Sequence, residues 1–179
     1  MLDTALTLDT DTLSPPSAAP AGVEHLAQGI VCGPWALAFR FEWARSLVEQ
    51  YDVVAVPKAP PWFVGAANID GNIIPVVDLA LYINPQASME ALGGVGSAQR
   101  RLLVGGMSAA GAEDAVAILF GQLPQQLRYQ PQDVNEVPGL PARLRELCAA
   151  YALDAGGQMF LEIDAERLTQ ALAQELSVL

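Results

Sequence analysis

Two aspartates resemble a catalytic motif more than any other residues in this sequence do. Asp154 begins an Asp-Ala-Gly turn, and Asp70 is followed directly by Gly71. Aspartic hydrolases hold two carboxylates in similar turns so that the pair shares one proton, and a hydroxyl after each aspartate orients them. Here Ala155 has no hydroxyl and Gly71 has no side chain. The motif is therefore incomplete, and a divergent aspartic hydrolase is kept only as the most specific enzymatic alternative. An assay for cleavage of unfolded peptide at acidic pH tests it.

Other reactive residue types are sparse. His25 is the only histidine, and we expect it to be an exposed residue at the start of a strand rather than a phosphotransfer site. Cys32 and Cys148 have no second cysteine or histidine at metal-ligand spacing, so both are interpreted as buried thiols in a reducing cytoplasm. The glycine-rich stretch 93–96 lacks the lysine that follows in a phosphate-binding loop. These observations predict a protein that is not an enzyme and that has no cofactor and no metal site.

Composition points to a globular protein with protein partners. The chain has 179 residues, of which 52% are hydrophobic, so it can bury a core as one domain or as two small intertwined domains. Its net charge of -11 predicts repulsion from nucleic acid and from anionic membrane surfaces. The sequence lacks an apolar stretch of about eighteen residues and the pattern of a secretory leader. It therefore predicts a cytoplasmic protein without direct membrane insertion.

Residues 1–24 differ in composition from the rest of the chain. They are rich in Thr, Asp, Ala and Pro and contain no Lys or Arg, which favours a flexible N-terminal tail. Scattered leucines leave open a second interpretation, in which the tail becomes ordered on a partner. The folded domain is predicted to span residues 25–179.

Residues 60–83 have the pattern of a β-hairpin followed by a short helix. The apolar run 62–64 begins the first strand, and Gly65 lets that strand bend. Asp70 and Gly71 both tolerate left-handed backbone, so we expect them at the tip of the hairpin.

The return strand of this hairpin is predicted at residues 73–77. Its unbroken apolar run favours burial on both faces, and Pro75 requires a bulge or an edge because it lacks a backbone donor. Asp78 ends the strand and is well placed to cap a short helix, which gives its carboxylate a structural role. Trp62 is expected to be buried beside the return strand.

This stretch resembles the hallmark motif of the CheW-like family, the adaptors of bacterial chemosensory arrays. The matching positions are dense over residues 59–79; they are Ala59, Pro60, Trp62, Phe63, Gly65, Asn68, Ile69, Gly71, Pro75, Val76, Val77, Asp78 and Leu79. The resemblance implies an all-β fold of two intertwined SH3-like five-stranded β-barrels with a short C-terminal helix.

Two departures from the family pattern concern partner binding. Asp70 stands where the family usually has arginine before the tip glycine, and residues 45–48 stand where it carries a Val-x-Glu-Val/Ile pattern. By resemblance, the partner-binding residues are Arg45, Asn68, Asp70 and Gly71. The motif assigns structural roles to Trp62, Gly65, Pro75 and Asp78. A partial repeat of the motif at residues 148–164, the internal echo, assigns a structural role to Asp164.

The resemblance also implies a function. Family members are non-enzymatic scaffolds of two-component signal transduction that couple methyl-accepting chemoreceptor tips to a CheA-type histidine kinase, and they also contact other CheW-like proteins. The pathway is either flagellar chemotaxis or the twitching-motility, PilI-like branch, and the tail and Asp70 favour a divergent, non-flagellar branch. A β-barrel binding module of unrelated function stays open as an alternative.

Short strands and turns are predicted for the rest of the chain. Strands are expected at 26–31, 35–39, 52–56, 100–104, 115–120 and 122–129. Residues 40–50 are expected to form a short helix or turn, because their apolar residues follow a helical stripe. Breaker-rich loops are expected at 84–98, 105–112 and 131–141, before a short helix at 141–148.

An internal echo links the two parts of the chain. Residues 148–164 repeat the order of strand, glycine turn, strand and closing aspartate, with Asp164 in the place of Asp78. The repeat predicts two similar barrels, divided at roughly residues 35–103 and the remainder, with strand exchange between them. Asp164 is the expected cap of an amphipathic C-terminal helix over residues 166–176, which packs on a barrel.

Overall fold

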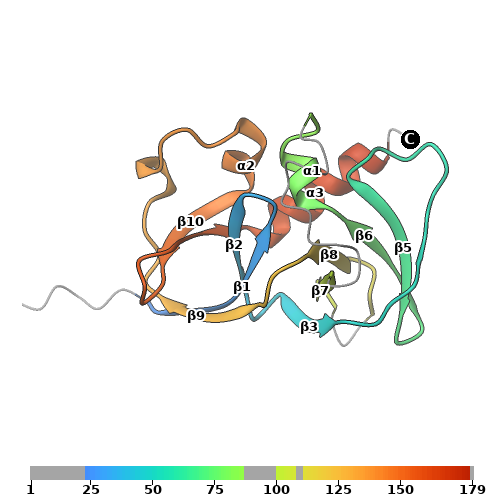
Figure 1. Cartoon of the computed structure of the whole chain (residues 1–179), viewed down its shortest axis with the longest axis horizontal. Coiled ribbons are helices and arrows are strands. Elements are labelled where there is room, and N and C mark those ends of the chain that lie inside the picture. The colour runs from blue at the N-terminus through green and yellow to red at the C-terminus, as the bar shows by residue number, and fades with distance from the viewer. Residues whose placement is uncertain (1–22, 87–99, 108–110, 178–179) are drawn as a thin grey trace, which may run out of the picture.

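The computed structural model describes residues 23–86, 100–107 and 111–177. Its strands are β1 (His25–Cys32), β2 (Trp35–Arg40), β3 (Ala44–Val48), β4 (Val53–Val54), β5 (Phe63–Ile69), β6 (Asn72–Val77), β7 (Arg101–Gly105), β8 (Val116–Phe120), β9 (Gln125–Tyr129), β10 (Cys148–Leu153) and β11 (Met159–Ile163). Its helices are α1 (Leu79–Ile83), the 3-10 helix η2 (Val134–Glu136), α2 (Ala142–Leu147) and α3 (Ala165–Leu176). The two halves of the fold lie side by side, with α1, α2 and α3 along one side (Figure 1).

The strands form two sheets. One sheet has the order β10-β11-β2-β1-β9, and the other has the order β3-β7-β8-β6-β5-β4. β3 follows β2 in the chain but pairs with β7 in the other sheet, while β9 follows β8 but pairs with β1. One sheet therefore consists of the consecutive strands β3–β8, and the other joins β1 and β2 to β9, β10 and β11 from later in the chain. The predicted all-β fold of two intertwined units with a C-terminal helix is confirmed.

The internal echo in the sequence corresponds to a repeated structural unit. In each sheet an antiparallel hairpin, β5–β6 or β10–β11, places its second strand parallel to a neighbour, β8 or β2. Asp78 N–H donates to the Trp62 carbonyl at 2.8 Å, and Asp164 N–H donates to the Leu147 carbonyl at 2.8 Å. Each aspartate then accepts two backbone N–H groups of the following helix through its Oδ1 atom. Both caps were predicted from the sequence.

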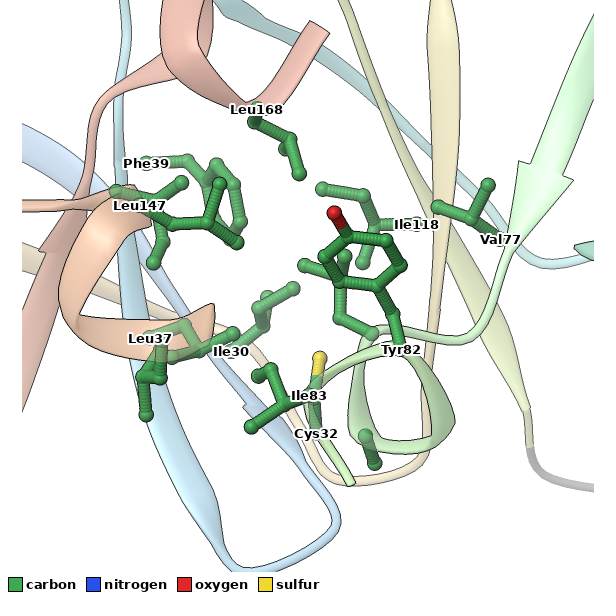
Figure 2. Close-up of a cluster of buried hydrophobic side chains, with 14 of the residues drawn as sticks. Ile30, Cys32, Leu37, Phe39, Val77, Tyr82, Ile83, Ile118, Leu147 and Leu168 are labelled. Atoms are coloured by element: carbon green, nitrogen blue, oxygen red, sulfur yellow. The ribbon is translucent and has the colours of Figure 1, made fainter. Parts of the chain in front are cut away.

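The largest core cluster joins the two sheets. Apolar side chains from β1, β2, β6, β8 and all three α-helices pack together there, and Figure 2 shows ten of them labelled. Leu168 and Leu172 of α3 are buried in this cluster, which confirms the predicted packing of the C-terminal helix. Two smaller clusters fill the two sheets separately. Burial of this apolar surface is the main stabilising contribution to the fold.

Several local predictions are wrong. Residues 44–48 form strand β3 rather than a helix or turn, because hydrogen bonding to β7 overrides the helical stripe. The predicted strand 52–56 contains only the two-residue strand β4. Ile73 is 70% exposed, so burial on both faces holds for the end of β6 but not for its start. The predicted strand 122–129 begins only at Gln125.

Both cysteines lie in apolar surroundings. Cys32 and Cys148 are buried and free, as the sequence predicted. Burial raises the pKa of the Cys148 thiol to about 12, and burial followed by the charge of Asp78 raises the pKa of Cys32 as well. Neither thiol is therefore a reactive thiolate at neutral pH. Residues 1–22 of the predicted tail and most of the predicted loop 84–98 lie outside the described residues.

Candidate docking surface

The β5–β6 hairpin ends in a two-residue turn. Ile69 pairs with Asn72, and the two residues between them, Asp70 and Gly71, have φ angles of 52° and 85°. Left-handed backbone at both central positions is typical of a type I′ turn, which Asp-Gly favours. The Asn68 carboxamide oxygen accepts the Gly71 N–H at 3.0 Å, so three of the four predicted partner-binding residues lie together at this tip.

Arg45 is not part of the tip. It lies exposed on β3, an edge strand, and β7 and β8 separate β3 from β6 in the sheet order. The pairing of strands therefore does not bring the side chain of Arg45 next to Asp70.

The hairpin carries an apolar face that points away from the core. Val54 is opposite Ala66, and Ala66 is opposite Pro75, so these three residues share one face of the sheet. Ile73 lies two residues before Pro75 and shares the same face. Val54 is 73% exposed and Ile73 is 70% exposed, while Ala66 and Pro75 are half-buried. We call these four residues the outer face.

Residues on the opposite side of the same strands are buried. Val53 packs against the smaller core cluster of this sheet, and Ala67, Ile69 and Ile74 are buried within it. Alternation along the strands explains this arrangement, because successive side chains point to opposite faces. The outer face is therefore apolar although its side chains do not pack in the core. Exposed apolar side chains that share one face of a sheet make that face a candidate interaction site.

The glycine and proline of the motif shape the hairpin. Gly65 has a φ angle of 147°, and a Cβ atom there would lie 2.3 Å from the Val54 carbonyl oxygen, so glycine allows β4 to approach. Pairing shifts register between Phe63 and Gly65, which is a β-bulge. Pro75 lies before the two residues of β6 that pair with β8, so its missing N–H costs no hydrogen bond to β8.

The base of the hairpin is fixed by an aromatic cluster. Trp62 is 3% exposed, and its ring lies edge-on to the Tyr82 ring with centroids 5.2 Å apart. Asp78 caps α1 beside it, and its second carboxylate oxygen lies 3.7 Å from Arg100 Nη1. These contacts connect the hairpin to the main core and hold the outer face in place.

A second polar site was missed by the sequence analysis. His25 was predicted to be exposed, but its side chain is only 16% exposed, and its Nδ1 atom lies 3.1 Å from Glu162 Oε2. The Tyr129 O–H donates to the same oxygen at 2.8 Å. Burial, then the hydrogen bond to Glu162, raises the pKa of Tyr129. The one feature of the sequence that could have indicated this site is the charged residue Glu162 within the apolar run Phe160–Ile163.

Two general features of the described part of the chain bear on function. No helix within residues 23–86, 100–107 and 111–177 is long and apolar enough to cross a membrane. Within the same ranges, His, Cys, Asp and Glu side chains form no group of three that could hold a metal ion.

Comparison with known proteins gives matches of two kinds. The family model of the CheW-like domain matches residues 30–173. The crystal structure of the scaffolding protein TtCheW from Thermoanaerobacter tengcongensis matches with a TM-score of 0.58 and 14% identity. That match covers 79% of this chain and 90% of TtCheW. The search of curated proteins found no match.

Proposed function

Because the chain belongs to the CheW-like domain family, we propose that it is a non-enzymatic adaptor that couples chemoreceptors to a CheA-type histidine kinase. The observation that carries this proposal is the outer face of the β5–β6 hairpin. Val54 and Ile73 project from a rigid sheet into solvent, and burying such a side chain completely contributes about 1.5–3 kcal/mol. A partner with a complementary apolar surface therefore gains binding free energy without reorganising the hairpin.

The place of action and the pathway belong to the same proposal. We propose that the protein acts in the cytoplasm, where chemoreceptor tips and the kinase are accessible to it, and that it also contacts other CheW-like proteins. The acidic tip residue Asp70 supports a divergent branch, such as one that controls twitching motility, over flagellar chemotaxis.

A pull-down from native cytosol tests the adaptor role. The tagged protein is expected to recover a histidine kinase or a chemoreceptor, and the Ile73→Asp variant is expected to recover less of it. Leu123→Asp is the matched control, because Leu123 is 79% exposed but lies outside the outer face. Recovery of neither partner by the wild-type protein would contradict the proposal and favour a binding module of unrelated function.

Asp70 offers a test of partner choice. By resemblance this position meets the receptor, and an acidic residue in place of arginine exchanges attraction for repulsion when the partner surface is acidic. We expect Asp70→Arg to bind a receptor-tip fragment of an ordinary CheW system more tightly than the wild type does, with a difference that shrinks at high salt. Titration of both proteins at low and high salt measures this. Equal affinities at both salt concentrations would mean that Asp70 only forms the turn.

The domain boundaries lead to a separate prediction. We propose that residues 25–179 form the CheW-like unit, with one subdomain at roughly 35–103, and that residues 1–24 are a tail dispensable for folding. The tail has no aromatic residue and no isoleucine, and Val23 is its only valine, so its burial could not offset the entropy of ordering it. Deleting residues 1–22 is expected to leave Tm unchanged within error. A large fall in Tm would show that the tail packs against the domain.

A further inference from the structure

The turn that follows β4 holds a lysine in left-handed backbone. Pro57 and Lys58 are the central residues of this turn, in which the Ala59 N–H donates to the Val56 carbonyl at 3.3 Å. Lys58 has a φ angle of 63° and is the only lysine in the sequence. A positive φ angle after a proline is typical of a type II turn, where glycine or asparagine is favoured because other residues are strained. A strained lysine at an exposed turn indicates that its charge has a use.

Lys58 and Asp70 lie at opposite ends of the outer face. β4 runs antiparallel to β5, and Val54 is opposite Ala66. From this pair β5 continues to Asp70 at the tip, so the chain after Val54 leads the other way, to Lys58. Both charged residues are exposed, and neither side chain forms an ion pair within the described residues. The outer face is therefore an apolar surface with a free positive charge at one end and a free negative charge at the other.

This pattern of charges is complementary to itself. We propose that the outer face binds the outer face of a second copy of this chain in a two-fold symmetric dimer. A two-fold axis that crosses the strands places Lys58 of each copy opposite Asp70 of the other, whereas an axis along the strands places like charges together. Val54 and Ile73 lie between the charged ends and supply the apolar contact. The charges therefore select one of the two orientations.

The dimer is weak and competes with the kinase. The outer face is small and each copy has a net charge of -11, so we expect a Kd on the order of 100 μM. A second copy covers the surface that the kinase is proposed to bind, so the two partners exclude each other. Self-association then regulates how much of the outer face is available. This consequence rests on the proposed adaptor function, whereas the dimer itself does not.

Sedimentation equilibrium of the purified full-length protein tests the dimer without any signalling partner. Concentrations up to about 1 mM are compared at about 0.15 M salt, where charges far from the contact are screened. We expect a reversible monomer–dimer equilibrium for the wild type. Ile73→Asp is expected to stay monomeric, because it places a charge in the apolar contact of both copies. Leu123→Asp is the control and should associate as the wild type does.

Charge exchange tests the proposed orientation. Lys58→Asp and Asp70→Arg are each expected to weaken the dimer about tenfold, because either change turns two attractive pairs into two repulsive ones. The double variant Lys58→Asp/Asp70→Arg restores both pairs with their charges exchanged and should recover the wild-type Kd within about threefold. Glu146→Lys is the matched control for Asp70→Arg, because it changes the net charge equally at an exposed position on α2. Its Kd should not increase.

Lys58→Gly separates the charge from the turn. Glycine relieves the backbone strain, so Tm should be unchanged or higher, while the dimer weakens about threefold to fivefold. A wild type that stays monomeric up to about 1 mM, unchanged Kd in the single charge reversals, or a double variant as weak as they are would each overturn the proposal. If a reversal does not fold, Lys58→Gly decides, and an unchanged Kd there would overturn it. Because only this protein is present, failure here leaves the pull-down result on the adaptor role unaffected.

Discussion

Trp62→Ala is expected to lower the free energy of unfolding by about 3–5 kcal/mol. The indole is 3% exposed and contacts the rings of both Phe63 and Tyr82, so truncation leaves a cavity in the largest core cluster. A loss of this size is a large share of the stability of a single domain. Urea unfolding followed by far-UV circular dichroism measures it, and insoluble or partly unfolded protein is the extreme form of the same result.

An exposed residue of the same hairpin provides the control. Ile73→Ala is expected to change the free energy of unfolding by no more than about 0.5 kcal/mol, because Ile73 is 70% exposed. If Trp62→Ala instead folds normally and loses a binding partner, Trp62 contributes to an interface rather than to the core.

Gly65→Ala is expected to destabilise the protein by about 2–4 kcal/mol. The added methyl group would lie 2.3 Å from the Val54 carbonyl oxygen and 2.9 Å from the Val54 carbonyl carbon. Both atoms belong to the backbone of β4, so relief requires β4 to move away from β5. A φ angle of 147° adds strain, because residues with side chains rarely adopt it. Chemical unfolding measures the loss.

Gly71→Ala separates the steric clash with β4 from the backbone strain of a positive φ angle. Gly71 also has a positive φ angle, 85°, but an added Cβ meets no atom within 4 Å. We expect this variant to lose only about 1 kcal/mol, from backbone strain alone. Equal losses in Gly65→Ala and Gly71→Ala would show that the approach of β4 does not require glycine at position 65.

Local chemistry explains which parts of the fold were predictable. The Asp70-Gly71 turn and the caps of α1 and α3 depend on residues next to each other in the chain, and the sequence patterns identified all three. β3 was misassigned because its strand conformation depends on hydrogen bonds to β7, more than fifty residues away in the chain. A local apolar pattern carries no signal for such a partner.

The outer face and the polar cluster of His25 and Glu162 illustrate the same limit. The tip of the hairpin was predictable from its turn residues, but the outer face depends on the register of β4, β5 and β6, which places Val54 and Ile73 on the same side. The polar cluster of His25 and Glu162 joins residues 137 positions apart. Only the paired sheets bring those side chains together, so His25 was expected to be exposed and the role of Glu162 was missed.

The affinity of the protein for the regulatory domain of a CheA-type kinase from the same cell tests the central claim most directly. Isothermal titration calorimetry should detect binding by the wild type, and Ile73→Asp should weaken it at least about tenfold, because it places a charge in an apolar contact. Leu123→Asp, an equally exposed site outside the outer face, should bind as the wild type does. Absence of wild-type binding would contradict the proposed adaptor role, and equal affinity in Ile73→Asp would contradict the proposal that the outer face contributes to binding the kinase.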